Sequence, residues 1–230
     1  MLLSAKKTQG HRLHARDGEI GRLQDLYFDD ISWQVRYLVV ELGNWFSPRE
    51  VLLSPSAIGH AVWDGGTLHL QLTRRQIADS PDVDTHLPVS RQHEEMLAAY
   101  YGWPIYWTGP VYTGMEPLST IPFRPEPPPE SPPGDAHLRS VDDILGYTVR
   151  CGDDKKGGHV TDFLFDDADW TIRSIELSTT HWPLEHKVLV KPANVSGIHW
   201  SRRTLQVRLT AKQLRALEEL REEAQKSGHV

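Results

Sequence analysis

Apolar and polar residues alternate in short runs along the chain, and residues typical of turns separate these runs. At 67–72, three leucines at every second position alternate with His69 and Gln71, so one face of this segment is apolar and the other is polar. The pattern predicts short antiparallel β-strands joined by tight turns. Aliphatic and β-branched side chains dominate two further predicted strands, at residues 35–42 and 51–53. Residues 19–28 are predicted to form a curved strand, in which Gly21 allows a bulge or tight bend.

Two motifs predict where short helices begin. Thr73 with Gln76, and Thr210 with Gln213, have the spacing of a capping box. In this motif the threonine hydroxyl accepts a hydrogen bond from an amide three residues later, and the glutamine side chain reaches back. A further helix is expected from about residue 90 to residue 101. The helices are few and short, so the fold class is expected to be mainly all-β.

The chain contains an internal repeat, in which residues 21–36 align with residues 158–173 without a gap. Both segments contain a glycine, a pair of aspartates and a tryptophan at matching positions. Self-similarity over this length indicates a duplication of one structural unit. The same register continues beyond these segments, and we call two residues that it aligns repeat partners. Three tryptophan pairs are repeat partners: Trp33 with Trp170, Trp45 with Trp182, and Trp63 with Trp200.

The repeat predicts two domains joined by a linker. We expect the first domain at residues 1–109 and the second at residues 138–230, with a Pro-rich linker at 110–137. Prolines concentrate at 122–133, which favours an extended polyproline-like conformation. The first domain continues past the repeat into a helix and an aromatic segment at 100–107, which has no counterpart in the second half.

Composition and charge narrow the range of partners and locations. The net charge is −6, so the chain lacks the basic excess that binding to nucleic-acid phosphates requires, and we expect no nucleic-acid partner. Cys151 is the only cysteine, which excludes an intramolecular disulfide and favours a reducing compartment. We see neither a signal peptide nor the run of about 20 apolar residues that a membrane span needs. We therefore expect no membrane insertion and a cytoplasmic location.

Four motifs follow one another in order in the first half, at residues 17–21, 26–30, 35–40 and 51–55. This ordered set resembles the PRC-barrel family, which includes the cytoplasmic domain of the photosynthetic reaction-centre H subunit and the C-terminal domain of the ribosome maturation factor RimM. The resemblance extends over residues 4–107 and, more loosely, over residues 138–214. It implies two small antiparallel PRC-type β-barrels with short flanking helices. It also implies an assembly or docking role without an active site.

The 12 histidines raise the question of a metal site. His11 and His14 are three residues apart on a predicted strand and should point to opposite faces, while a proline separates His181 from His186. No pair of histidines has the helical spacing of a zinc motif. We therefore expect surface histidines, with no metal site and no cofactor.

Acidic pairs occupy the same turn in both copies of the repeat, Asp29 with Asp30 and Asp166 with Asp167. Short acidic side chains accept hydrogen bonds from the amides of their own turn. A calcium loop would instead need the spacing and the terminal glutamate of an EF-hand. We predict a structural role for these four aspartates.

The sequence offers no catalytic residues. No serine stands in a nucleophile motif, and Cys151 is predicted to be a small apolar residue of a strand. We therefore expect that the protein is not an enzyme.

Aromatic residues gather directly after the helix predicted to end near residue 101. Large, rigid aromatic side chains dominate interface hot spots, although the same rings could instead cover one end of a barrel. The leading hypothesis is a docking or assembly module that binds another protein or a second copy of itself. The alternative is a protein that binds a metal ion or small ligand through His and Asp side chains. The proposed partner-binding residues are Tyr100, Tyr101, Trp103, Ile105, Tyr106 and Trp107.

Overall fold

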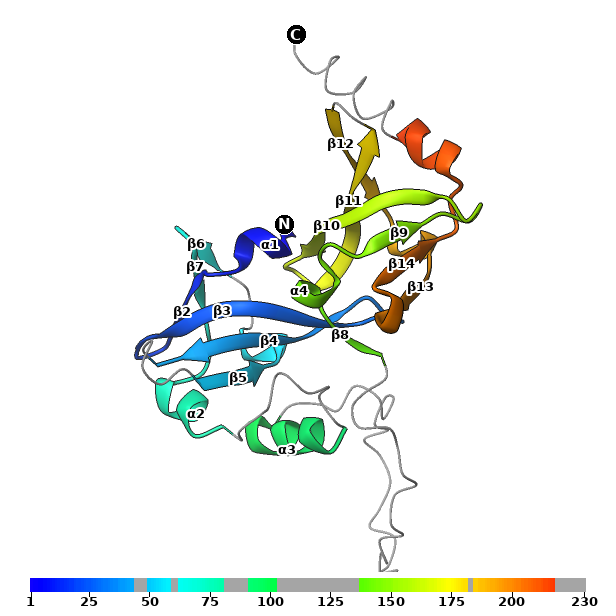
Figure 1. Cartoon of the computed structure of the whole chain (residues 1–230). Helices are drawn as coiled ribbons and strands as arrows, with labels where there is room; N and C mark the ends of the chain where they lie inside the picture. Colours follow the sequence, from blue (N-terminus) through cyan, green and yellow to red (C-terminus); the bar gives the residue numbers. More distant parts are fainter. Residues whose placement is uncertain (44–48, 59–61, 81–90, 103–136, 182–183, 218–230) are drawn as a thin grey trace, which may run out of the picture.

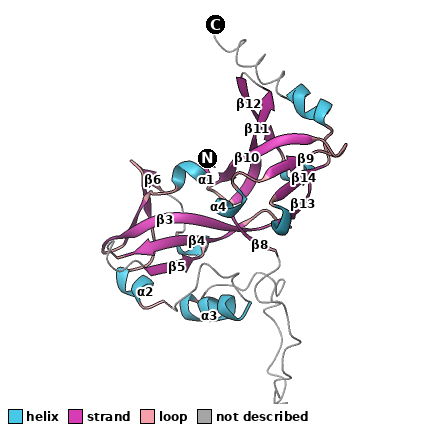
Figure 2. Cartoon of the chain, in the orientation of Figure 1, coloured by secondary structure: helices cyan, strands magenta, loops and turns pink. Residues whose placement is uncertain are grey.

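The chain folds into two β-sheets that pack against each other, with short helices around them (Figures 1 and 2). The computed structural model describes residues 1–230 with the exception of 44–48, 59–61, 81–90, 103–136, 182–183 and 218–230.

The first sheet is built mostly from the first half of the chain, in the order β5-β4-β3-β2-β7-β6. β2 pairs with the first half of β3, and β8 pairs with its last three residues. The seven strands are β2 (Arg12–Ala15), β3 (Gly18–Asp29), β4 (Val35–Leu42), β5 (Arg49–Leu53), β6 (Trp63–Asp64), β7 (Thr67–His69) and β8 (Leu138–Ser140).

The second sheet has the corresponding order β12-β11-β10-β9-β14-β13, and β1 pairs with the end of β10. Its strands are β1 (Leu2–Ser4), β9 (Thr148–Arg150), β10 (Lys156–Asp166), β11 (Thr171–His181), β12 (Leu184–Val190), β13 (Val195–His199) and β14 (Thr204–Val207).

The helical segments are short, and the α-helices named below have four to 11 residues. Residues 211–217 are also helical. The α-helices are α1 (Ala5–Thr8), α2 (Arg74–Ala78), α3 (Arg91–Tyr101) and α4 (Val141–Ile144), and the 3-10 turns are η1 (Pro55–Ala57), η3 (Pro192–Asn194) and η4 (Trp200–Arg202).

Each sheet receives one strand from the other half of the chain. β1, from the start of the chain, pairs antiparallel with β10, and β8, which follows the linker, pairs antiparallel with β3. Figure 1 shows both exchanges, with α1 beside β10 and β8 beside β3. Sheet membership therefore does not follow the order of the chain at these two strands.

Many elements lie where the sequence pattern predicts them. The predicted strand at 35–42 coincides with β4, and the predicted strand at 19–28 corresponds to β3. The capping box at the start of α2 forms in full, because Thr73 and Gln76 satisfy each other's backbone amides. The predicted strand at 67–72 is shorter than expected, since β7 ends at His69.

The expectation of closed, fully antiparallel barrels requires correction. β2 runs parallel to β7, and β9 runs parallel to β14, so each sheet contains one parallel pair. Within the described residues, the terminal strands of each sheet are not paired with each other, so neither sheet closes. The terminal strand β6 has only two residues, and its Trp63 packs across to Phe165 and Trp170 of the second sheet. This side of the first sheet thus contacts the other unit.

Two glycines allow the sheets to curve tightly at matching positions. A Cβ atom on Gly21 would lie 2.1 Å from the Glu41 carbonyl oxygen, and one on Gly158 would lie 2.0 Å from the Ser178 carbonyl oxygen. A bulge follows each glycine along β3 and β10. Only glycine permits this approach between neighbouring strands.

One continuous hydrophobic core spans both sheets. Phe28 of the first sheet and Phe163 of the second are fully buried, with ring centroids 5.4 Å apart. Backbone hydrogen bonds also cross the joint in reciprocal fashion. Val35 N–H donates to the Trp170 carbonyl at 2.8 Å, and Ile172 N–H donates to the Trp33 carbonyl at 2.8 Å.

Candidate functional site

The first sheet has a second apolar face, directed away from the core, which helix α3 covers. Tyr37 and Val39 of β4 form a cluster there with Leu52 of β5, and Leu97 of α3 packs onto them. Figures 1 and 2 show α3 along this outer side of the sheet. The cluster explains why these strands are apolar on both faces rather than strictly alternating.

The corresponding face of the second sheet has a different character. The repeat partners of Tyr37 and Val39 are Ser174 and Glu176, and Glu176 forms an ion pair with Lys187 at 2.9 Å. Leu189, the repeat partner of Leu52, is 37 % exposed. Covering by a helix is therefore a feature of the first sheet in the described part of the chain.

Helix α3 also leaves apolar side chains partly exposed. Met96 and Tyr100 are each 43 % exposed, and their spacing of four residues places them next to each other on the helix surface. The Tyr100 hydroxyl donates a hydrogen bond to the Gln76 carbonyl of α2 at 3.2 Å. The two helices thus share one surface, which we call the α2–α3 face. It consists of Gln76 of α2 and of Met96 and Tyr100 of α3.

The two neighbouring tyrosines of α3 have different environments. Tyr101 packs against the covered cluster, and burial raises the pKa of its phenol to about 12. Tyr100 is more exposed, and the two rings meet edge to face at 4.8 Å. The other proposed partner-binding residues, Trp103, Ile105, Tyr106 and Trp107, lie outside the described residues.

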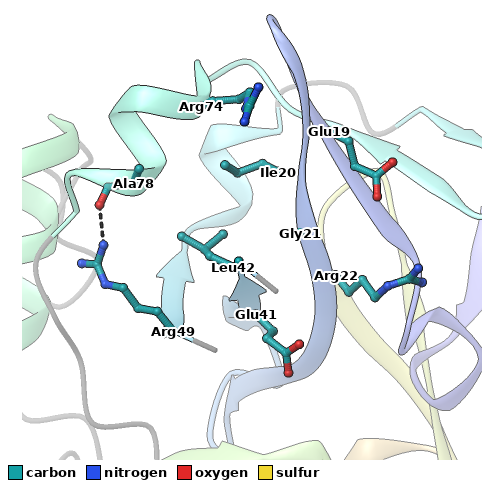
Figure 3. A pocket seen from close by; sticks show the side chains of 10 residues that line it. Glu19, Ile20, Gly21, Arg22, Glu41, Leu42, Arg49, Arg74 and Ala78 are labelled. Carbon is teal, nitrogen blue, oxygen red and sulfur yellow. Dashed lines mark hydrogen bonds between the residues drawn. The ribbon is translucent and has the colours of Figure 1, made fainter. Parts of the chain in front are cut away.

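A cavity of about 730 Å³ adjoins helix α2 (Figure 3). Ile20 of β3 and Leu42 of β4 lie on the side of the strands that faces α2. Arg49 closes one end, because its guanidinium donates to the carbonyl oxygens of Ala78 and Ser80. The described residues around this cavity combine the apolar side chains of Ile20 and Leu42 with charged side chains, those of Glu19, Arg22, Glu41, Arg49 and Arg74.

The acidic turns make their own contacts at the joint between the sheets. The Asp29 carboxylate accepts hydrogen bonds from the backbone amides of Ile31 at 3.1 Å and Ser32 at 2.6 Å. Burial alone would raise the pKa of Asp29, but these hydrogen bonds outweigh it and hold the pKa below its ordinary value. Asp166, in the equivalent turn, accepts from the Ala168 amide at 3.1 Å.

The second aspartate of each turn contacts residues next to or within the exchanged strands β1 and β8. Asp30 accepts from Arg139 Nε at 2.8 Å and lies 3.0 Å from His137 Nδ1. Asp167, the equivalent residue, contacts the amino group of Met1. Asp30 therefore binds the segment that contains β8, and Asp167 binds the segment that contains β1.

Two further aspartates, which were not among the predicted turn residues, cap helices α1 and α4, which directly follow the exchanged strands β1 and β8. Asp162 accepts from the Lys6 amide at 3.0 Å and from the Ser4 hydroxyl at the start of α1. Asp25 accepts from the Asp142 amide at 3.1 Å and from the Ser140 hydroxyl at the start of α4. Asp25 and Asp162 are repeat partners, so the repeat itself contained the signal that marks them as a pair.

Neither histidines nor carboxylates gather into a metal-binding cluster in the part of the chain that the structure describes. His14 and His69 are neighbours on the parallel strands β2 and β7, with ring centroids 5.4 Å apart. His11 instead contacts the Trp63 ring, at 5.7 Å. Two histidines alone provide fewer ligands than a structural zinc site requires.

Cys151 lies in the core of the second sheet and is completely buried. Burial raises the pKa of its thiol, so the reactive thiolate is disfavoured. This environment is that of a small apolar residue rather than of a nucleophile.

Residues 137–214 match the PRC-barrel domain family, so a PRC-barrel domain is present in this part of the chain. The matched region includes every strand from β8 through β14. No match to a curated protein was found. No helix among the described residues is long and apolar enough to cross a membrane.

Proposed function

We propose that this protein is a non-enzymatic, cytoplasmic docking or assembly module. In this proposal the α2–α3 face, together with the aromatic segment that follows α3, binds another protein or a second copy of the chain. The observation that carries the proposal is the two-sided helix α3. Leu97 is buried against the first sheet, whereas Met96 and Tyr100 of the same helix remain partly exposed.

Packing of α3 onto the sheet does not itself require large apolar side chains at exposed positions. Exposed Met and Tyr at neighbouring positions are instead typical of protein interfaces, where both residue types are enriched. The aromatic residues Trp103, Tyr106 and Trp107 follow directly in the sequence and are part of the proposed partner-binding set.

We further propose that the two sheets are tandem PRC-barrel units that arose by duplication of a self-associating ancestor. Their equal strand order, the reciprocal exchange of β1 and β8, and the constant register of the repeat support this origin. The reciprocal bonds of Val35 and Ile172 fit a pseudo-twofold axis at the joint. Helix α3 departs from this symmetry in the described part of the chain, because the helix at 211–217 corresponds only to α2.

The docking surface can be tested with two sets of variants in the full chain. The first set combines Met96→Ser with Tyr100→Ser, and the second combines Trp103→Ser with Tyr106→Ser. The matched control is Leu97→Ala, which lies on the buried side of the same helix. Light scattering and sedimentation measure self-association, capture from the native host measures partner binding, and thermal unfolding measures stability.

We expect the exposed-side variants to reduce the associated mass or partner capture while the melting temperature stays nearly constant. Leu97→Ala should instead lower the unfolding free energy by about 2 to 5 kcal/mol, the cost of a large-to-small core substitution. The proposal is wrong if both exposed-side variants leave association and partner capture unchanged. Strong destabilisation by both would assign these side chains to packing alone.

A further inference from the structure

A separate cavity lies on the second sheet, over the parallel strands β9 and β14. It has a volume of about 480 Å³, within the range of small-molecule sites. It is distant in sequence from the α2–α3 face and shares none of its residues. The residues that line it are Arg150, Asp154, His199, Arg202, Thr204 and Gln206.

Basic groups predominate in this cavity. Among the described residues, no carboxylate lies within ion-pair distance of the guanidinium group of Arg150 or Arg202. The Arg150 guanidinium donates instead to a neutral group, the Asp154 carbonyl, at 3.3 Å. Other arginines of this protein are neutralised, for example Arg139 by Asp30 at 2.8 Å. The cavity therefore concentrates positive charge on a protein whose net charge is −6.

The fold does not require these basic residues. In the first sheet the matching parallel pair places His14 opposite His69, where the second sheet places Arg150 opposite Gln206. The repeat partner of Arg202 is Gly65. One unit forms the same strand pair without the arginines, so a purely structural role does not account for them.

We propose that this cavity binds a small phosphate-bearing anion. The planar guanidinium groups of Arg150 and Arg202 each offer paired N–H donors, which match the oxygens of a phosphate group. The Thr204 hydroxyl and the Gln206 amide supply additional neutral donors on β14. The negative charge of the Asp154 side chain repels an anion and lowers its binding affinity, whereas the two arginines raise that affinity.

Calorimetric titration of the full chain with pyrophosphate and with adenosine diphosphate, at moderate salt, tests the proposal. The two ligands distinguish recognition of phosphate alone from recognition of an organic phosphate. Arg150→Gln and Arg202→Gln remove the charges, and Asp154→Asn removes the opposing carboxylate. Arg12→Gln is the matched control, because Arg12 is an exposed arginine on the parallel strand pair of the first sheet.

We expect saturable binding at one site for at least one of the two ligands. Each arginine variant should weaken it about tenfold or more, as expected for a lost charge-assisted hydrogen bond. Asp154→Asn should strengthen binding, and Arg12→Gln should leave it unchanged. If Arg150→Gln does not fold, Arg202→Gln alone decides, because Arg202 lies on the exposed turn η4.

Three outcomes would overturn the proposal. The first is the absence of saturable binding up to about 10 mM of either ligand. The second is an equal loss of affinity in Arg12→Gln and Arg202→Gln, which would indicate a nonspecific charge effect. The third is weaker binding in Asp154→Asn, which would be inconsistent with an anion in this cavity.

Discussion

Asp25 provides a quantitative test of how the exchanged segment is held. Its Oδ1 atom accepts from the Leu26 amide at 2.7 Å and from the Asp142 amide at 3.1 Å, and its Oδ2 atom contacts the Ser140 hydroxyl. Burial raises the pKa of Asp25 to about 7, although these hydrogen bonds oppose the shift. The folded protein therefore favours the protonated carboxyl more strongly than the unfolded chain does.

The difference between the ordinary pKa of 3.8 and about 7 sets the energy scale. About three pK units at 1.36 kcal/mol each correspond to about 4 kcal/mol. Asp25 retains partial contact with solvent, which screens its charge, so we expect about half of this value, ~2 kcal/mol. Because the folded-state pKa is raised, this contribution to stability is fully present below about pH 4. It is lost as the pH rises through about 7.

The substitution Asp25→Asn reproduces the protonated form. The asparagine oxygen can accept from both amides, and its NH2 group can donate to Ser140. We expect Asp25→Asn to raise the unfolding free energy by about 2 kcal/mol at pH 8 and to leave it nearly unchanged at pH 4. Asp25→Ala should destabilise the protein at both pH values, because two amides lose their acceptor.

Urea unfolding of the three proteins between pH 4 and pH 8 measures these differences. Groups other than Asp25 titrate equally in each protein, so their contributions cancel when the variants are compared with the wild type at each pH. A stability difference between Asp25→Asn and wild type that does not change with pH would refute the reasoning. So would destabilisation by Asp25→Asn at pH 8.

Two further predictions concern the turns and the core. Asp29→Ala should lower the unfolding free energy at neutral pH by about 1 to 2 kcal/mol, since the turn amides lose their acceptor. The pKa of Asp29 is lowered in the folded protein, so this loss of stability should shrink as the pH falls and the wild-type carboxylate becomes protonated. Urea unfolding at pH 7 and pH 3 measures the loss, and an equal loss at both pH values would contradict the prediction. The Cys151 thiol should react with a thiol reagent only after unfolding, and rapid reaction of the native protein would contradict its burial.

Local patterns in the sequence predict much of the secondary structure. β4 and the start of α2 follow directly from a β-branched run and from a capping box. Turn residues such as Asp17 and Gly18 mark where β2 returns into β3. These signals are short in range, so they can be read without knowledge of the tertiary fold.

The arrangement of the two halves depends on contacts that local patterns do not contain. β1 and β8 are three residues long, too short for a periodic signal, and long-range capping contacts to Asp162 and Asp25 accompany their pairing. Trp63 and Trp200 occupy the same position of the repeat, yet Trp63 packs at the joint while Trp200 is 57 % exposed. Sequence equivalence alone did not reveal this difference in environment.

The candidate docking site was predictable only in part. The sequence located the aromatic residues at the end of α3, but it treated Tyr100 and Tyr101 as equivalent. In the structure Tyr101 packs onto the sheet, whereas Tyr100 is more exposed and its hydroxyl bonds to α2. The direction of each side chain depends on where the helix axis lies relative to the sheet, which sequence spacing does not specify.

The exchange of β1 and β8 also has a consequence for the order of folding during synthesis. β1 pairs with residues 164–166, which lie about 160 positions later in the chain. At a translation rate of about 5 to 20 residues per second, β1 remains unpaired for roughly 8 to 32 s before its partner emerges. The first sheet is likewise incomplete until β8 has been made. Strands that are so far apart in the chain can pair only after the later strand has been made. The two sheets should therefore be completed together at the end of synthesis rather than one after the other.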